Sequence, residues 1–321
     1  MRRNRIRCVL AIAALGLAAT LVGCSGGTAN PTTTPSVTGS PTETPSATDL
    51  GGRLLFSRFN ESDHTFAGMF TCLPNGSAET AVPMPGPEGG GRWSRSGKEI
   101  AVMTVLADGR VGTAIIAPDG KVLRVLKIPD ATLNLVATAW SWDDRRVAGE
   151  AWDDADPSRN GIYSVRASDG GDLRRMTTPP DGKKDLPGDY SPDGRFVFKR
   201  HSGDEGPGPL MLVDASGGEP RTLYSGSMED PGRFAPDGRS VVSSSNWHIQ
   251  VVDMDGKVLN DFTVDGAHLF GPVWSPDGTR IAFSMGTTGP FAELYTSLPD
   301  GTDRQQVTHT AENEIAVDWG P

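Results

Sequence analysis

Asp154, Asp156 and Ser158 have the spacing of the first three ligands of a calcium-binding loop. Such a loop also needs a glycine at its sixth position and a bidentate glutamate at its twelfth, because the chain must turn sharply and the last ligand must close the shell. Arg159 and Val165 stand at those two positions. Only the first half of the loop therefore fits calcium, and we predict no metal site here.

Two further chemistries can be weighed from residue types and their spacing. A serine nucleophile on an α/β-hydrolase fold would need a G-x-S-x-G turn, which the sequence lacks. A zinc site would need His or Cys residues at ligand spacing, whereas the five histidines are scattered singly. We therefore predict no catalytic residue, no metal and no cofactor.

The strands and turns that would position any site follow a repeated sequence pattern. Trp274 opens the segment WSPDGTRIAFSM, in which Ser-Pro-Asp-Gly is a tight turn and the following residues have the pattern of a half-buried strand. Pro276 pre-sets its φ for the turn, and Gly278 accepts the positive φ that closes a hairpin. The spacings between successive segments are 47, 50, 44, 40 and 45 residues. The related segments begin at Trp93, Trp140, Tyr190 and Phe234, and the chain ends on Trp319, Gly320 and Pro321.

A second motif lies between these segments, a short apolar strand that ends in a glycine turn. A further strand follows each turn, so the two motifs give four strands per repeat and six repeats. Units of four short strands at this period are typical of β-propeller blades, which bury their faces only against one another. We therefore predict an all-β, six-bladed β-propeller with four-stranded blades. The glycines of the second motif are Gly76, Gly120, Gly170, Gly217, Gly218, Gly256 and Gly301.

The order W-S-P-D-G, I-A-F, L-Y, D-G and a closing L-T resembles the repeat of the TolB-type propellers. The match covers roughly residues 53–321 and is clearest in the repeats that begin at Tyr190, Phe234 and Trp274. Two repeats depart from it: Arg95 and Ser96 replace Pro-Asp in the second, and Trp142 and Asp144 replace Pro and Gly in the third.

This resemblance implies a scaffold for protein association. TolB proteins also carry an α/β domain ahead of the propeller, whereas a short tether takes that place here. Some six-bladed propellers of other families use a central metal for catalysis. A metal-dependent lyase or lactonase at the mouth of the channel is therefore the enzyme alternative.

The first repeat lacks the strand that should begin it. RLLFSRF, residues 53–59, occupies the place that EIAVMT and RIAFSM occupy in later repeats, and IAVDWGP near the chain end supplies the missing strand. We therefore predict that the C-terminal strand completes the first blade and closes the ring, which removes exposed sheet edges. The aromatic residues predicted to pack between blades at equivalent places are Trp93, Trp140, Tyr190, Phe234, Trp274 and Trp319.

A propeller presents the connections between blades, and the loops between the second and third strands of each blade, around one mouth of its channel. These segments form a polar rim with some aromatic residues, where we expect an envelope protein or a glycan to bind. The simpler interpretation is that each side chain is an ordinary solvated loop residue. The candidate partner-binding residues are Asp63, His64, Asp153, Asp154, Asp156, Arg159, Arg200, His201, Asp204, Trp247, His248, His268, Glu312 and Glu314.

The N-terminal segment has the composition of an export signal. MRRNRIR supplies four arginines and no acid, and an apolar run ending in LVGC follows. The run is similar to a lipoprotein signal, which implies that Cys24 is acylated and holds the chain at the extracytoplasmic face of the cell membrane. An ordinary signal peptide with an incidental Cys24 is the alternative. We predict a signal peptide at 1–23, a lipid-bearing cysteine and disordered Thr/Pro/Ser-rich linker at 24–51, and the propeller at 52–321.

Charge and cysteine content limit the partners. The net charge of −10 includes four signal arginines, and without them the chain from Cys24 onward carries −14. Nucleic acid and anionic lipid both attract positive charge, so neither is an expected partner of this acidic chain. Cys72 lies in an apolar strand pattern, which predicts a buried side chain and not a reactive thiol. We expect a monomeric domain.

Overall fold

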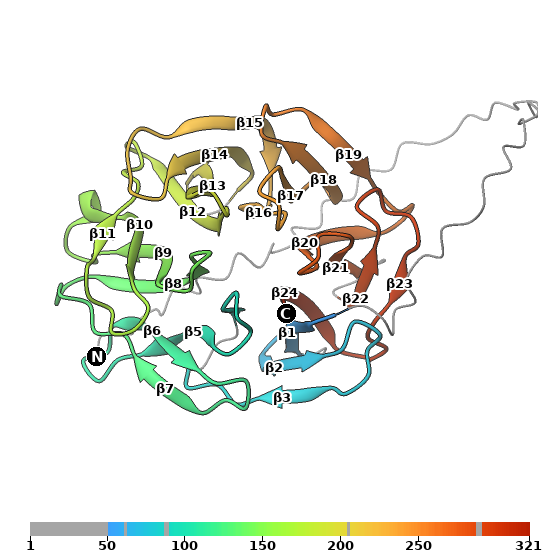
Figure 1. Ribbon diagram of the computed structural model, residues 1–321, viewed down its shortest axis with the longest axis horizontal. Coiled ribbons are helices and arrows are strands. Elements are labelled where there is room, and N and C mark those ends of the chain that lie inside the picture. The colour runs from blue at the N-terminus through green and yellow to red at the C-terminus, as the bar shows by residue number, and fades with distance from the viewer. Residues whose placement is uncertain (1–50, 61–62, 87–89, 204–205, 287–290) are drawn as a thin grey trace, which may run out of the picture. The chain divides into compact units, whose positions relative to one another are not determined.

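A computed structural model describes residues 51–60, 63–86, 90–203, 206–286 and 291–321 of the protein. Over these residues the structure contains 24 strands and one short 3-10 helix, Pro157–Arg159. The strands form six sheets of four strands each, arranged in a ring (Figure 1). The predicted six-bladed propeller is confirmed. The proposed signal, Cys24 and most of the linker lie outside the described residues, and within the described ones no helix is long and apolar enough to cross a membrane.

Five blades pair their strands in chain order, and blade 1 takes its first strand from the end of the chain. Blade 1 is β24 (Asn313–Gly320), β1 (Arg53–Phe59), β2 (Phe66–Cys72) and β3 (Thr80–Val82). Blade 2 is β4 (Gly91–Trp93), β5 (Ile100–Val105), β6 (Val111–Ile116) and β7 (Val122–Val125). Blade 3 is β8 (Asn134–Trp140), β9 (Arg146–Trp152), β10 (Gly161–Arg166) and β11 (Arg174–Arg175).

The remaining blades follow the same order. Blade 4 is β12 (Lys183–Tyr190), β13 (Arg195–Ser202), β14 (Gly208–Asp214) and β15 (Arg221–Met228). Blade 5 is β16 (Arg233–Phe234), β17 (Ser240–Ser245), β18 (His248–Asp253) and β19 (Val258–Phe262). Blade 6 is β20 (His268–Trp274), β21 (Ile281–Gly286), β22 (Ala292–Ser297) and β23 (Gln305–Gln306).

The C-terminal strand closes the ring as predicted. β24 pairs antiparallel with β1, and Phe56 lies opposite Ala316. Phe56 and Ala316 belong to one buried cluster with Trp319 of blade 1 and Val273 of blade 6. Blade 1 thus joins both ends of the described chain.

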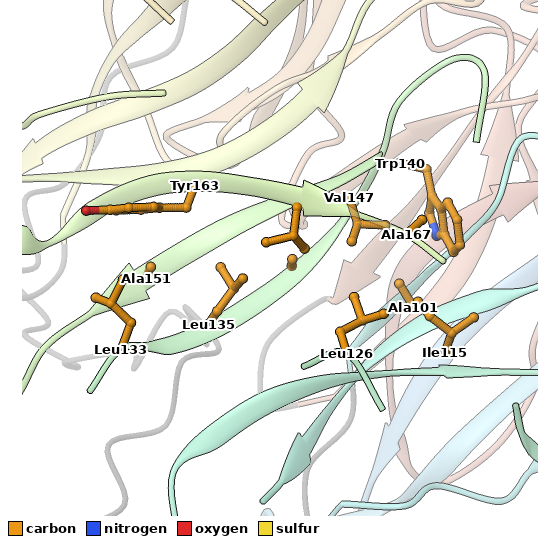
Figure 2. Packing of buried hydrophobic residues seen from close by; sticks show 12 residues of the cluster. Ala101, Ile115, Leu126, Leu133, Leu135, Trp140, Val147, Ala151, Tyr163 and Ala167 are labelled. Atoms are coloured by element: carbon orange, nitrogen blue, oxygen red, sulfur yellow. The ribbon is translucent and has the colours of Figure 1, made fainter. Parts of the chain in front are cut away.

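The aromatic residue that ends each first strand packs between blades, also as predicted. Trp140 lies against Ala101 and Ile115 of blade 2 and Val147 of its own blade (Figure 2). Its Nε1 donates a hydrogen bond of 3.0 Å to the carbonyl of Arg92 in blade 2. The equivalent residues are buried except Trp274, which is half-buried.

The antiparallel blades give the ring two distinct faces. We call the face with the turns between first and second strands the floor. The opposite face, with the connections between blades and the loops between second and third strands, is the mouth. Gly51, the first described residue, lies on the floor, where its carbonyl accepts a 3.1 Å hydrogen bond from Trp319 Nε1.

On the floor, the proline of one W-S-P-D-G turn packs against the glycine of the next blade. A Cβ atom added to Gly238 would lie 2.9 Å from Pro192 Cδ, so this contact leaves no room for a side chain. The repeat therefore keeps proline and glycine for packing between blades as well as for turn geometry. The pairs are Pro192 with Gly238, Pro236 with Gly278, Pro276 with Gly52, and Pro321 with Gly97.

The two repeats that depart from the motif meet at the junction of blades 2 and 3. Asp144 replaces the glycine, and its carboxylate accepts hydrogen bonds from the backbone N–H groups of Arg95 (2.7 Å) and Ser96 (2.9 Å). The guanidinium of Arg95, which replaces the proline, lies 4.6 Å from the ring centre of Trp142. A polar contact thus substitutes here for the Pro–Gly contact.

Candidate functional site

Trp247 lies on the mouth, at the tip of the hairpin between β17 and β18. Ser245 pairs with His248, so Asn246 and Trp247 form a two-residue turn, with φ values of 48° and 67°. Hairpins of this type need positive φ at both positions and favour glycine at the second. A bulky L-residue there costs roughly 1–2 kcal/mol, so another feature of the structure must hold Trp247 in place.

His268, the first residue of β20, holds the indole of Trp247. The two rings are stacked with 4.1 Å between their centres and 15° between their planes. The carbonyl of Trp247 also accepts a 3.2 Å hydrogen bond from the N–H of Leu269. Both ring-bearing side chains are half-buried. The mouth thus carries an ordered aromatic pair that joins blades 5 and 6.

Two adjacent acids lie beside this turn. Glu229 donates its N–H to the Ser244 carbonyl at 2.8 Å. Asp230 accepts hydrogen bonds at Oδ2 from Ser244 Oγ (2.5 Å) and from the N–H of Gly271 (2.9 Å). Burial, and then the neighbouring Asp230, raise the pKa of Glu229, although the N–H of Asn246 faces the same carboxyl and opposes the shift. Two adjacent acidic residues therefore lie beside the turn.

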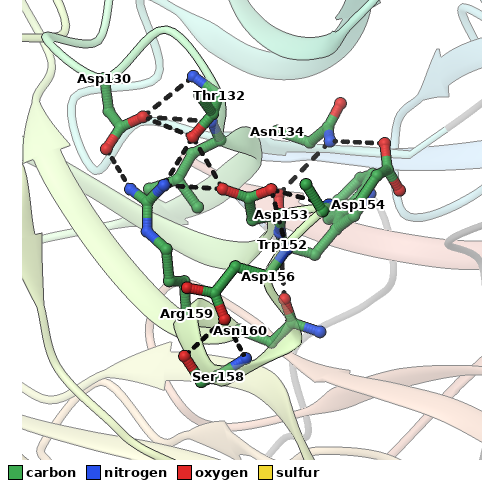
Figure 3. A network of polar contacts seen from close by, with 12 residues as sticks. Asp130, Thr132, Asn134, Trp152, Asp153, Asp154, Asp156, Ser158, Arg159 and Asn160 are labelled. Carbon is green, nitrogen blue, oxygen red and sulfur yellow. Dashed lines mark hydrogen bonds and ion pairs between the residues drawn. The ribbon is translucent and has the colours of Figure 1, made fainter.

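A second polar group at the mouth joins blade 3 to the connection from blade 2 (Figure 3). The Nη1 of Arg159 donates to Asp153 Oδ2 (2.6 Å) and Thr132 Oγ1 (2.5 Å), and its Nη2 pairs with Asp130. Asp153 also accepts the Thr132 hydroxyl (2.7 Å) and the N–H of Ala155 (2.9 Å). These hydrogen bonds, led by that from Thr132, lower the pKa of Asp153. The network fixes the β9–β10 loop.

The other acids of this loop have separate partners. Asp156 caps the 3-10 helix, because its Oδ1 accepts the N–H (3.1 Å) and hydroxyl (2.6 Å) of Ser158. Asp154 Oδ2 lies 3.5 Å from Asn134 Nδ2. In the described part of the chain, no group of three or more His, Cys, Asp or Glu side chains is placed to hold a metal ion.

Arg200 and His201 lie inside blade 4. Arg200 forms a bidentate ion pair with Asp185, with distances of 2.6 and 2.8 Å. The His201 side chain is buried, and this burial, followed by the charge of Lys199, lowers its pKa. Its Nδ1 has no hydrogen-bond partner among the described residues. Neither side chain is therefore exposed on the rim as predicted.

Glu314 is also buried, with 0% of its surface exposed. Its Oε1 accepts hydrogen bonds from Arg58 Nε (2.7 Å) and Thr310 Oγ1 (2.9 Å), so it belongs to the packing of β24 on β1. Burial raises its pKa, and the Arg58 bond opposes that shift. Glu312 precedes β24, and its N–H donates to Thr310 Oγ1 at 3.2 Å.

The remaining predicted residues are spread around the rim. Asp63 folds back on Thr65, whose N–H and hydroxyl it accepts at 3.0 and 2.6 Å, and His64 beside it is exposed. His248 Nδ1 lies 3.0 Å from an oxygen of Asp261 on the outer strand β19. Asp204 lies outside the described residues. Among the residues predicted singly, the structure thus brings together Trp247 with His268 and Asp153 with Arg159.

Four residues of these two groups were missed from sequence. Asp130 and Thr132 lie in the connection between blades 2 and 3, and Glu229 and Asp230 in the connection between blades 4 and 5. The rule that places blade connections at the mouth applies equally to both segments. The position of these connections between blades was therefore the sequence signal that could have found the four residues.

On the floor side, charged links cross the centre of the ring. Arg92 of blade 2 donates to the Gly188 carbonyl of blade 4, and Arg95 Nη2 donates to Asp189 Oδ1 at 2.7 Å. Arg233 of blade 5 donates to the Val317 carbonyl of blade 1 at 3.2 Å. Each link passes over an intervening blade. Side chains of blades 2 and 5 thus reach across part of the floor end of the ring.

The single free cysteine of the described residues, Cys72, is buried as predicted. Burial raises the pKa of its thiol to about 12, so it stays protonated and unreactive at neutral pH.

No family model matches this chain. A segment of 135 residues is 27% identical to the uncharacterized protein Atu1656 of Agrobacterium fabrum, covering 41% of this chain and 44% of that protein. The match thus spans less than half of that relative's length.

Solved structures give broader coverage. TolB from Acinetobacter baumannii superposes with a TM-score of 0.65 at 20% identity, over 85% of this chain and 67% of that one. A putative TolB from Agrobacterium tumefaciens gives 0.54 at 16% identity, over 84% and 100%. The fold is that of the TolB propellers. An oligogalacturonate lyase in complex with manganese superposes with a TM-score of 0.52 at 16% identity, over 81% of this chain and 74% of that one.

Proposed function

We propose that this protein is an extracytoplasmic lipoprotein, anchored through Cys24, whose TolB-like propeller binds another envelope protein at its mouth. The observation that carries the proposal is Trp247. A glycine would form the same turn without strain, yet the chain places a large aromatic side chain there and stacks it on His268. Strained backbone of this kind concentrates at functional sites.

Trp247 also has the properties of a binding anchor. Tryptophan dominates the energetics of protein interfaces because it buries a large area at little cost in side-chain entropy. Here one face of the indole is already fixed by His268, so little order remains to be imposed when a partner arrives. Pre-organisation of this kind strengthens binding.

The two faces of the propeller suit the two parts of the proposal. Gly51, the last residue of the predicted linker, lies on the floor, and Trp247 lies on the mouth. The chain thus continues toward Cys24 from the face opposite the proposed binding site.

Fractionation tests the anchor. Cys24→Ala should abolish acyl labelling and leave either an unprocessed precursor or a released domain, because no other group would hold the mature chain at the membrane. Labelling of the variant with palmitate, or a wild-type protein that is soluble after ordinary cleavage, would contradict the anchor.

Affinity capture tests the binding site. The propeller should retain one envelope protein on a column, and Trp247→Ala should lose it. The matched control is Trp142→Ala, since Trp142 is 39% exposed but lies on the floor. Retention of a cell-wall glycan in place of a protein would identify the other predicted class of partner. Equal capture by both variants would contradict a site at the mouth.

The enzyme alternative makes a different prediction. It is supported by the similarity to the manganese-bound lyase, which has the same propeller architecture. If catalysis is the function, turnover of a lactone or an acidic glycan should need a bound metal, and chelation should abolish activity and lower the melting temperature together. Stoichiometric metal after dialysis, with chelator-sensitive turnover, would favour it over the binding module.

A further inference from the structure

The hairpin of Trp247 combines an aromatic ring with carboxylates in a way that suits one class of ligand. The Asp230 carboxylate accepts hydrogen bonds at Oδ2 from Ser244 Oγ and from the N–H of Gly271, and so serves the packing of blades 5 and 6. Glu229 is half-buried and faces the N–H of Asn246, the residue before Trp247. The Glu229 carboxyl thus lies at the backbone of the residue that precedes Trp247.

We infer that this site recognises a cationic side chain of the partner, a lysine ammonium or an arginine guanidinium, through the indole of Trp247 and the carboxylate of Glu229. The inference rests on the proposed function, because it names the chemistry of the partner that the mouth would bind. It requires no movement of the turn, since the indole and Glu229 are both held by contacts of their own.

The physical basis is twofold. A cation over an indole face is attracted by the negative face of the ring, most strongly where water is excluded. A partly buried carboxylate beside a second acid has lost part of its hydration, and a cation restores the stabilisation that burial removed. The indole of Trp247 and the carboxylate of Glu229 therefore both favour a positive ligand over a neutral or negative one.

The cation already nearest to Glu229 does not fill this role. Lys199 directs its ammonium to backbone carbonyls, that of Gly206 at 2.9 Å and that of Glu229 itself at 2.5 Å. It lowers the pKa of Glu229, but burial and Asp230 outweigh it and the net shift is upward. The pKa of Glu229 thus stays raised with Lys199 in place.

The charge of the whole chain acts in the same direction. Without the four signal arginines the chain carries −14, which attracts basic partners over long range and repels acidic ones. Long-range attraction raises the rate of encounter, whereas Trp247 and Glu229 would decide where a basic side chain is held. The inferred partner therefore presents a lysine or an arginine on an exposed segment.

Titration of the propeller and its linker with short peptides tests this inference. The probes are capped hexapeptides of glycine and serine with one central arginine, lysine, glutamine or glutamate, titrated at about 150 mM salt, where the screening length is about 8 Å. We expect the arginine and lysine peptides to bind more tightly than the glutamine peptide, and the glutamate peptide to bind least. Trp247→Ala and Glu229→Gln should each weaken the basic peptides by about fivefold, and Trp247→Phe by less.

Matched controls separate the site from general charge attraction. Glu219→Gln makes the same charge change at an exposed position on the floor side of blade 4, and Trp142→Ala removes an exposed indole from the floor. Both should leave the affinities within about twofold, and melting curves should show every variant folded. Equal weakening by Glu219→Gln and Glu229→Gln, or no preference for basic peptides, would overturn the inference.

The outcome is distinguishable from failure of the proposed function. An envelope protein captured through Trp247, together with peptides that bind without regard to charge, would leave the binding module intact and overturn only the cation site. Basic peptides that bind through Trp247 and Glu229 support the cation site even where the column retains no envelope protein.

Discussion

Two acids of the propeller, Glu150 and Asp318, have pKa values near 6. For each the main cause is burial, which disfavours the charged form. Arg92 and then Arg95 oppose the shift at Asp318, yet the net pKa is still about 6. Asp318 Oδ2 also accepts the N–H of Trp93 at 2.8 Å, a bond that an asparagine carbonyl could keep.

Asp318→Asn should therefore change how stability depends on pH. Because folding raises the pKa of Asp318 from 3.8 to about 6, this carboxyl stabilises the fold below its ordinary pKa and loses that contribution as pH rises through 6. The melting temperature of the variant relative to wild type should rise between about pH 4.5 and pH 7.5.

The exposed Asp169 supplies the control for this experiment. Its pKa is lowered, chiefly by the Arg166 side chain, so its contribution is present above its ordinary pKa and is lost only in more acid solution. Asp169→Asn should show a constant offset from wild type across the same range. A pH-independent offset for Asp318→Asn as well would show that its carboxyl is not desolvated.

At the scale of the elements, local and non-local features were predictable to different degrees. Turns, strands and the aromatic residue of each repeat follow from neighbouring residues, so Trp140 and Trp319 could be placed from sequence alone. The pairing of Arg159 with Asp130, or of Trp247 with His268, depends on which loops meet across a blade boundary. Spacing along one chain does not contain that information, and residues such as Glu314 therefore looked like rim candidates while the fold buries them.

The departures in blades 2 and 3 illustrate the same difference. From the sequence, Arg95 and Asp144 were two separate losses of the motif. In the structure they bond to each other across the blade junction, which explains why the ring tolerates both. Neither residue alone indicates that contact.

Asp144→Gly would restore the motif and should nevertheless destabilise the propeller. Glycine relieves the positive φ of 57° at this position, worth about 1 kcal/mol. The backbone N–H groups of Arg95 and Ser96 would lose a charged acceptor, and hydrogen bonds to charged groups contribute about 1.5–3 kcal/mol each. We expect a net loss of about 2–5 kcal/mol in urea unfolding.

Asp144→Asn keeps one carbonyl acceptor and is the matched comparison. It should lose less stability than the glycine variant. A glycine variant that equals or exceeds wild type would mean that the polar contact does not compensate for the missing Pro–Gly contact.

At the scale of the whole molecule, closure through β24 holds the ring together. Deleting residues 315–321 would remove the strand paired with β1 and uncover the cluster around Leu54 and Phe56. Apolar surface exposed in this way costs about 25 cal/mol per Å², so several hundred Å² amount to several kcal/mol. That is a large share of the stability of a domain, and the truncated protein should aggregate or melt far below wild type.

Deletion of Pro321 alone is the control for that truncation. It removes only the contact with Gly97 on the floor and leaves β24 paired. A small fall in melting temperature is expected. An unchanged melting curve after the longer deletion would contradict closure through this strand.

At the same scale, the floor and the mouth of the propeller differ in what lies on them. Gly51 lies on the floor beside Trp319, and side chains link blades across the ring on that side. We propose the opposite face, the mouth, as the surface that binds a partner. Trp142 on the floor and Trp247 on the mouth are partly exposed indoles on opposite faces. They place the same side-chain chemistry on two opposite faces, of which only the mouth is proposed to bind a partner.

Site-specific photo-crosslinking in intact cells tests this claim most directly. A photo-reactive phenylalanine derivative is placed at position 247 in one strain and at position 142 in another, and the irradiated products are identified. Binding at the mouth predicts that position 247 yields a defined adduct with one envelope protein and that position 142 does not. The same adduct from position 142 alone, or equal adducts from both positions, would contradict it.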